Sequence, residues 1–347
     1  MKPILALILG FLSVVTAMPF FINYLNRKNT SQSVSEYSLK EFKEKKKTPT
    51  MGGVLFVLFP VVTMTILYPQ SWLEIKTALV YLAYLAYGGI GLWDDLKIVI
   101  EKKNDGISAR TKFTAQVILA VVFYLLYRQS ASSIIVVPFT GWEWNLGWLY
   151  AVLVFFMFAG ASNGVNLTDG MDGLAGGTSL LAFIPFATIA YLRGEEVLFA
   201  FILACIGALI AYLRYNWHPA KIFMGDTGAL ALGGVLAALA FVMKLEFALL
   251  VIGGVFVFET VCVILQIGSV KLRKKRIFIY TPIHYAFTMS GWKEKNTVLF
   301  FCFLGALCAF LGILFGGSAC VRSWSAEQRA AAWPRRAYYS NTVSKSS

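Results

Sequence analysis

The sequence has little charge for its length, and this shortage argues against a soluble protein. Only 14% of its 347 residues are charged, whereas an ordinary soluble domain carries about a quarter. The net charge of +13 could by itself indicate a nucleic-acid partner. Lysine and arginine also accumulate on the cytoplasmic side of membrane proteins, and this explanation is the simpler one. We therefore expect no nucleic-acid binding.

The five cysteines form no pattern. Cys320 lies near the end of the chain, and the other four fall inside apolar runs, at Cys205, Cys262, Cys302 and Cys308. No two of them are spaced as a CxxC pair. Neither a disulfide framework nor a cysteine metal centre is expected, and the side chains are best interpreted as small buried apolar groups.

Apolar residues are abundant, forming 58% of the chain at a mean hydropathy of +0.68. They occur in runs of about 16–24 residues, the length at which a helix crosses a bilayer. A helix also satisfies its own backbone polar groups inside lipid. We predict an all-α polytopic membrane protein with about ten spans, at 3–24, 51–68, 77–93, 113–128, 147–163, 173–192, 196–213, 229–243, 247–269 and 297–315.

These spans place residues 1–315 in one integral membrane domain. The first run is too long for the apolar core of a signal peptide and is followed by a lysine-rich loop, so we interpret it as a span. Residues 316–347 have five Lys/Arg against one Glu and little apolar content. We expect this segment to be a disordered tail without a function.

Lysine and arginine alternate between the two sets of loops. One set carries 21 of them, at 25–50, 94–112, 164–172, 214–228 and 270–296. The opposite set carries five before the tail, at Lys2, Lys76, Arg128, Arg193 and Lys244. The first set is therefore expected in the cytoplasm, with both termini on the outer, periplasmic side.

All six aspartates fall on the cytoplasmic set of loops, at Asp94, Asp95, Asp105, Asp169, Asp172 and Asp226. Five of them stand at the ends of apolar runs, in turns rich in glycine and asparagine. Asp105 instead lies in a stretch of lysine and asparagine, without an evident partner. We therefore expect a site built from the other five at the cytoplasmic face.

The adjacent pair Asp94 and Asp95 ends the third apolar run. Neighbouring carboxylates repel each other, so both stay ionised only near cations. The pair is typical of a metal site or a general base. An ordinary polar helix end is the alternative that this motif alone leaves open.

The loop Asn163–Gly173 combines two Asn, one Thr and two Asp. Asp169 and Asp172 are three residues apart and share a face if the turn is helical. Asn163 and Asn166 offer donors and acceptors for a base or a sugar, and the glycines let the backbone approach a ligand. A simple connection needs none of these features, so we predict a ligand-binding loop.

A second loop, Asn216–Gly228, contains an aromatic ring and a carboxylate. Phe223 could stack on a base, and Asp226 offers the hard oxygen that magnesium prefers beside phosphate. Lys221 could meet a phosphate or simply orient the protein. His218 precedes a proline, and we interpret it as structural.

Other cations of the cytoplasmic set are open to two interpretations. Lys47 and Lys112 could meet phosphates or act as plain orienting charges. The run Lys271–Arg276 is typical of a lipid-headgroup anchor. His284, one of only two histidines, fits a site or a structural role equally. Glu259 lies within the ninth span, where a charge needs a partner or water; bracing the bundle and lining a lipid groove both fit, and catalysis does not.

Together these motifs resemble the polyprenyl-phosphate N-acetylhexosamine-1-phosphate transferase superfamily, and within it most closely the MraY family. The strings that carry the resemblance follow the family's order, at Lys47–Gly53, Asp94-Asp95, Gly106–Lys112, Asn163–Gly173, Pro219–Gly228, Gln266 with the basic run, and Pro282–His284 with Gly291-Trp292. One position departs from the pattern. Where members usually show three consecutive histidines, this chain reads His284-Tyr285-Ala286.

The resemblance implies a magnesium-dependent enzyme of the bacterial inner membrane. It would move phospho-N-acetylmuramoyl-pentapeptide from UDP to undecaprenyl phosphate, giving lipid I and UMP for peptidoglycan synthesis. Asp94, Asp95 and Asp226 would be catalytic, with Asp226 and Asp95 as metal ligands. The expected substrate-binding residues are Lys47, Lys112, Asn163, Asn166, Asp169, Asp172, Asn216, Phe223 and His284. A homodimer is compatible with the sequence.

Two rival functions remain open at this stage. A sister transferase would use UDP-N-acetylglucosamine and a polyprenyl phosphate. A transporter would favour internal repeats and ionisable groups at the membrane midplane. Glu259 is the one clear midplane charge, and no repeat is evident in the sequence.

Overall fold

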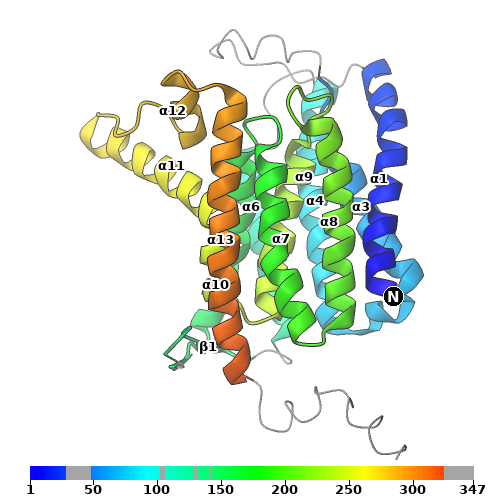
Figure 1. Ribbon diagram of the computed structural model, residues 1–347. Coiled ribbons are helices and arrows are strands. Elements are labelled where there is room, and N and C mark those ends of the chain that lie inside the picture. Colours follow the sequence, from blue (N-terminus) through cyan, green and yellow to red (C-terminus); the bar gives the residue numbers. More distant parts are fainter. Residues whose placement is uncertain (29–47, 102–105, 129–131, 141, 324–347) are drawn as a thin grey trace, which may run out of the picture.

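The computed structural model describes residues 1–28, 48–101, 106–128, 132–140 and 142–323. Lys47, Asp105 and residues 324–347 lie outside these ranges. The described part is a bundle of long helices, from which one helix projects (Figure 1). This arrangement confirms the predicted all-α membrane fold.

The long helices correspond to the predicted spans. Nine helices of the described residues are long and apolar enough to cross a membrane. They are α1 (Lys2–Arg27), α4 (Ile75–Glu101), α5 (Ala109–Tyr127), α6 (Leu149–Thr168), α7 (Leu174–Leu192), α8 (Glu196–Asn216), α9 (Gly225–Val242), α11 (Gly254–Arg273) and α13 (Glu294–Ser323). The remaining predicted span is the shorter α3 (Gly53–Leu67), which is followed by a 3₁₀ turn, η2 (Pro69–Leu73).

Two spans differ from their predicted outlines. Helix α4 continues to Glu101, so Asp94 and Asp95 lie inside a helix and not on a loop as expected. The ninth span is broken at Gly253 into α10 (Glu246–Ile252) and α11. After this break α11 leaves the bundle at an angle (Figure 1).

Three short elements lie in segments that were predicted only as loops. Strands β1 (Ile134–Val136) and β2 (Glu143–Asn145) form an antiparallel pair. Helix α12 (Ile283–Met289) lies inside the expected loop 270–296. The N-terminus and β1 are at one end of the bundle and α12 is at the other (Figure 1).

Helix α9 is the most enclosed element of the bundle. Every one of its residues is buried except Asp226, in its first turn. Glycines let its neighbours approach closely: a side chain at Gly91 of α4 would overlap the Asp226 backbone, and one at Gly53 of α3 would overlap Gly228. The backbone of α9 therefore packs closely against α3 and α4. This packing fixes the position of Asp226 at the N-terminal end of α9.

Candidate active site

Carboxylates from distant parts of the sequence meet at the end of the bundle where α12 lies. Helix α4 ends there, α6 ends there, and α5 and α9 begin there. Asp94 and Asp95 come from α4, Asp226 comes from α9, and Asp169 is the residue that caps the end of α6. These four aspartates therefore lie together at one end of the bundle, as expected.

Asp94 is buried, with 5% of its surface exposed. One carboxylate oxygen, Oδ1, accepts a hydrogen bond from the Ile107 backbone N–H at 2.9 Å. The same oxygen lies 3.3 Å from the Lys112 ammonium. Gly106 stands against this carboxylate, where a side-chain carbon would lie 2.5 Å from Oδ1. The segment before α5 therefore wraps closely around Asp94.

Lys112 joins Asp94 to Asp226. Its ammonium, on the first turn of α5, also forms an ion pair and hydrogen bond with Asp226 Oδ2. The other oxygen of Asp226 accepts from the Asn166 side-chain amide at 2.9 Å. The Lys112 ammonium thus lies between the carboxylates of Asp94 and Asp226. Side chains from α4, α5 and α6 surround Asp226.

Asp95 has a different task from its neighbour. It is 1% exposed, and it accepts from the backbone N–H groups of Asp226 at 3.1 Å and Thr227 at 3.0 Å. The Thr227 hydroxyl donates to it at 2.6 Å. The first N–H groups of a helix have no partner within the helix, and a carboxylate there is stabilised by the helix dipole. Asp95 therefore caps α9 and fixes where Asp226 begins.

Asp169 lies where negative charge is concentrated. Burial, together with the nearby charges of Asp226, Asp95 and Asp172, raises the pKa of its carboxyl to about 8. A carboxyl with that pKa carries its proton at neutral pH. Among the described residues, the cluster has more carboxyl groups than cations, which favours binding of a further cation.

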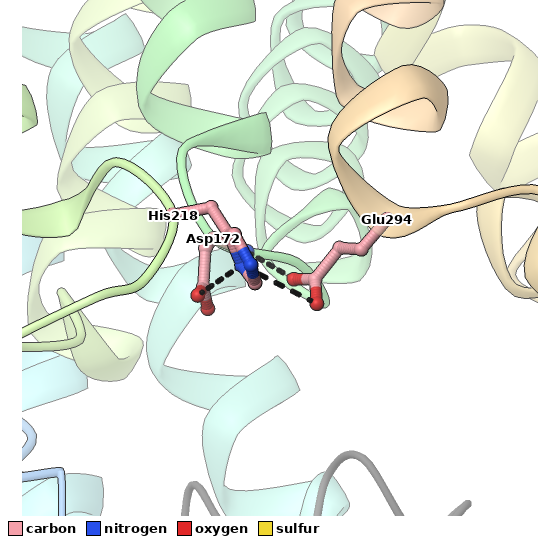
Figure 2. Close-up of side chains that lie close together, drawn as sticks. All are labelled: Asp172, His218 and Glu294. Carbon is pink, nitrogen blue, oxygen red and sulfur yellow. Dashed lines mark hydrogen bonds and ion pairs between the residues drawn. The ribbon is translucent and has the colours of Figure 1, made fainter.

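Asp172 belongs to a separate group with His218 and Glu294 (Figure 2). His218 Nδ1 lies 3.1 Å from Asp172 Oδ2 and 3.8 Å from Glu294 Oε2. Among the described residues this is the group of His, Cys, Asp and Glu whose ligand atoms, all within 4.8 Å, could hold a metal ion.

The carboxylates of this group are already occupied by backbone donors. Asp172 Oδ2 accepts from Ala220 N–H at 3.0 Å, and Glu294 Oε1 accepts from Asp172 N–H at 2.9 Å. These contacts tie the α6–α7 turn to the α8–α9 loop and to the start of α13. His218 and Glu294 were not predicted for the site. Glu294 was missed because only aspartates were traced along the loops, although it lies in the same basic loop set.

Two asparagines that we expected to bind substrate have side chains that brace neighbouring helices and loops. The Asn163 amide donates to Gln116 Oε1 at 2.9 Å and to Ala159 O at 2.8 Å. Asn216 is 2% exposed; its oxygen accepts from Gly173 N–H at 3.0 Å and its nitrogen donates to Ile222 O at 2.9 Å. Asn216 thereby fastens the two predicted ligand-binding loops to each other.

Phe223 is half-buried, and its backbone pairs with the segment that precedes α3. Gly52 N–H donates to Phe223 O at 2.8 Å, and Phe223 N–H donates to Pro49 O at 2.9 Å. This pairing brings the segment around Pro49 next to the segment that precedes Asp226. Both segments were expected to contribute to the same site. Lys47 precedes Pro49 and lies outside the described residues.

His284 is fully buried at the start of α12. Its ring nitrogen Nδ1 lies 2.9 Å from the carboxylate of Glu259, which is also fully buried. Next to it, the Tyr285 hydroxyl donates to Gly170 O at 3.0 Å. Of the two roles considered for Glu259, the bracing role is the one that these contacts support.

A multi-pass helical bundle with a partly buried lysine–carboxylate cluster at one end is the architecture of an integral membrane enzyme. Residues 77–244 match the family model described as glycosyl transferase family 4, and residues 45–57 match signature 1 of the phospho-N-acetylmuramoyl-pentapeptide-transferases. The first range contains Asp94, Asp95, Lys112, Asn166 and Asp226.

Curated relatives match nearly the whole chain. The phospho-N-acetylmuramoyl-pentapeptide-transferase of Geobacillus thermodenitrificans (strain NG80-2) is 44% identical over 312 residues, which cover 89% of this chain and 96% of the relative. That of Bacillus subtilis (strain 168) is 44% identical over 310 residues, covering 88% and 95%. This chain belongs to the phospho-N-acetylmuramoyl-pentapeptide-transferase family and is a membrane transferase of peptidoglycan synthesis, as the motifs predicted.

Proposed function

We propose that the chain transfers phospho-N-acetylmuramoyl-pentapeptide from its UDP-activated form to undecaprenyl phosphate, producing lipid I and UMP. Family membership over most of the chain supports the reaction. The observation that carries the proposal is the cluster of Asp94, Lys112 and Asp226 at one end of a membrane bundle. Such a site can bring a water-soluble donor and a lipid acceptor together at one surface of the membrane.

We further propose that this surface faces the cytoplasm and that the bilayer is the bacterial inner membrane. Among the described residues of the basic loop set, Lys112, Arg214 and Lys221 lie at the end of the bundle that carries the cluster, and positive charge favours the cytoplasmic side. A nucleotide-activated donor would reach the site directly from that side. The chain could also work as a homodimer.

The residues of the cluster fit a magnesium ion. Asp94 and Asp226 converge on one position from two helices, and that position already holds a cation, the Lys112 ammonium. Carboxylate oxygens are the ligands that magnesium takes in proteins, usually together with phosphate oxygens. Asp226 is the first candidate ligand. Asp95, the second residue expected to bind the metal, contributes here by holding Asp226 in place. Bound magnesium would offset the charge that gathers on the phosphate oxygens during transfer.

Asp94 and Lys112 supply the remaining chemistry of the transfer. Both substrates are anions, so a cation on the protein reduces their repulsion. Lys112 is the residue placed to do so, since its ammonium lies between Asp94 and Asp226. Asp94, held by Ile107 N–H, would take a proton from the acceptor phosphate as general base. Direct attack by Asp94 on the donor phosphate is the alternative, and the ligand-free geometry fits both.

The donor nucleotide would bind beside the loops Asn163–Gly173 and Asn216–Gly228, which meet next to the cluster. Asn166 and Asp169 lie nearest the cluster, and Phe223 offers a ring to the base. Asp172 and Asn216 would act mainly by shaping these loops, since their side chains are tied to Ala220 and Gly173. Lys47 and Asn163 would contact the substrate as the sequence predicts, and His284 would contact a phosphate.

Incubation of the purified protein with undecaprenyl phosphate and a UDP-sugar tests the proposal. Release of UMP and formation of the lipid product are measured with UDP-N-acetylmuramoyl-pentapeptide or UDP-N-acetylglucosamine, with magnesium or with EDTA. We expect product only from the muramoyl donor and only with magnesium. Transfer from N-acetylglucosamine alone would assign the chain to the sister reaction, and no transfer from either would contradict the proposal.

A further inference from the structure

Glu259 is a buried carboxylate to which the proposed reaction gives no task. It lies in α11 and accepts three hydrogen bonds from the start of α12. The Ile283 N–H lies 2.7 Å from Oε2, while the His284 N–H at 3.2 Å and His284 Nδ1 at 2.9 Å both reach Oε1. A buried carboxylate is tolerated only when it is compensated in this way. The same contacts fix the plane of the His284 ring.

The contact with Glu259 determines what the other ring nitrogen can do. A carboxylate only accepts, so Nδ1 carries the shared hydrogen. That leaves Nε2, which is buried and has no hydrogen-bond partner among the described residues. The Tyr285 ring packs against the imidazole with 4.2 Å between centroids, which further limits its movement. A buried nitrogen without a partner is costly and rare, which points to a ligand at this position.

Nε2 faces Gly170 in the α6–α7 turn. A side-chain carbon at Gly170 would overlap Nε2 and would lie 2.7 Å from the Tyr285 hydroxyl oxygen. Gly170 therefore packs directly against Nε2, and its lack of a side chain allows the α6–α7 turn to lie this close to the ring. The preceding residue, Asp169, is close enough to Asp226 and Asp95 for their charges to raise its pKa. The free nitrogen thus lies at the turn that borders the carboxylate cluster.

We propose that Glu259 is a positioning residue that holds His284 so that Nε2 binds a phosphate oxygen of the nucleotide donor beside Gly170. The proposal rests on the transfer reaction proposed above. A protonated ring paired with Glu259 carries no net charge, so the buried pair can present Nε2–H to an anion. The only other histidine of the chain, His218, pairs with Asp172 in the separate group, so the contact depends on His284 alone.

Kinetics of a double-mutant cycle separate positioning from structural support. We expect Glu259→Gln to lower kcat/KM for the nucleotide donor about 10–100-fold, by analogy with the loss that follows when the partner orienting a metal-binding histidine is removed. If Glu259 acts through His284, the double variant Glu259→Gln/His284→Asn is no slower than His284→Asn alone. Multiplied losses in the double variant, or a Glu259→Gln rate within twofold of wild type, would overturn the proposal.

A matched control lies at the opposite end of the bundle. Glu246 is 6% exposed and accepts from the Tyr150 hydroxyl at 2.7 Å. Glu246→Gln should lower the Tm in detergent while kcat/KM stays within twofold of wild type. A comparable loss of kcat/KM in this control would show that any buried carboxylate affects the rate, and the special role of Glu259 would be lost.

Nitrogen-15 spectra of histidine-labelled protein give a readout that does not need turnover. The chain has two histidines, so the spectrum of His284→Asn identifies the His284 signals. We expect Nδ1 to be protonated in wild type and the Nε2 signal to shift on addition of UMP with magnesium, and both features to be lost in Glu259→Gln. A signal that ignores UMP would refute this inference even in an active enzyme. An enzyme that shows the shift but no transfer would refute only the proposed reaction.

Discussion

Asp94 and Asp95 are neighbours in sequence but work in different directions. Successive side chains of a helix point about 100° apart, so Asp94 turns to Lys112 while Asp95 turns to the start of α9. The sequence predicts that the pair matters, because two adjacent carboxylates need cations or donors. It cannot assign the two directions, because Lys112 and Asp226 are distant in the chain.

Asp95→Asn should destabilise the protein as well as abolish transfer. An amide keeps one acceptor, but its NH₂ group would face the N–H donors of Asp226 or Thr227. Loss of a helix cap costs about 1–2 kcal/mol. We expect a lower Tm in detergent for Asp95→Asn than for Asp94→Asn, whose amide oxygen can still accept from the single backbone N–H of Ile107. An equal Tm for the two variants would contradict the capping role.

Because the pKa of Asp169 is raised, the effect of this carboxyl on the stability of the folded protein should depend on pH. Its pKa is about 8 in the folded protein against about 3.9 when unfolded. Between these values the unfolded state has lost the proton and the folded state retains it, so wild type loses stability as pH rises, up to about pH 8. The Tm advantage of Asp169→Asn over wild type, both without ligand, should therefore grow from pH 5 to pH 8 and then level off. A constant difference over that range would show that the pKa is not raised.

At the scale of elements, α4 and α9 form the frame of the site. Gly91 lets α4 touch the backbone of Asp226, whereas Gly89 of the same helix is exposed, and a side-chain carbon added there would meet no atom within 4 Å. The two glycines therefore offer a matched pair in one helix.

Gly91→Ala should displace Asp226 and cost about 1–3 kcal/mol through overpacking. Gly89→Ala should instead stabilise α4 by about 0.5–1 kcal/mol, because alanine is the better helix former. Tm and UMP release are measured for both variants. Wild-type activity in Gly91→Ala would mean that the close contact of α4 with α9 does not position Asp226.

Element prediction succeeded where one physical signal dominates. The nine long spans follow directly from long apolar runs. The shorter helix α3 follows from a shorter apolar run. The sequence did not reveal the break at Gly253, the β1–β2 pair or α12. Each of these depends on packing or on hydrogen bonds between residues that are separated in the chain. Helix α12 is an example: its first N–H groups are held by Glu259, 24 residues away from Ile283.

At the scale of the molecule, the aspartates found by position did gather at one end. The sequence could not predict that Asn163 and Asn216 act as braces, or that His218 and Glu294 hold Asp172. Those roles depend on which loops meet in space. The predicted sidedness follows from charge alone, and it needs its own test.

Cysteine accessibility in intact cells checks that sidedness. In a variant without the native cysteines, Glu143→Cys on β2 and Lys221→Cys beside the site lie at opposite ends of the bundle. We expect a membrane-impermeant maleimide to label Glu143→Cys in intact cells and Lys221→Cys only after the membrane is opened. The reverse pattern would place the site outside and contradict the orientation.

The central claim is that the carboxylate of Asp226, held by Lys112 and Asn166, is required for the transfer. Magnesium-dependent UMP release by Asp226→Asn, with undecaprenyl phosphate and the muramoyl-pentapeptide donor, tests it most directly, with Glu246→Gln as the folded control. We predict that Asp226→Asn releases no UMP above background while it keeps a Tm near that of wild type. Near-normal release by Asp226→Asn would contradict the account.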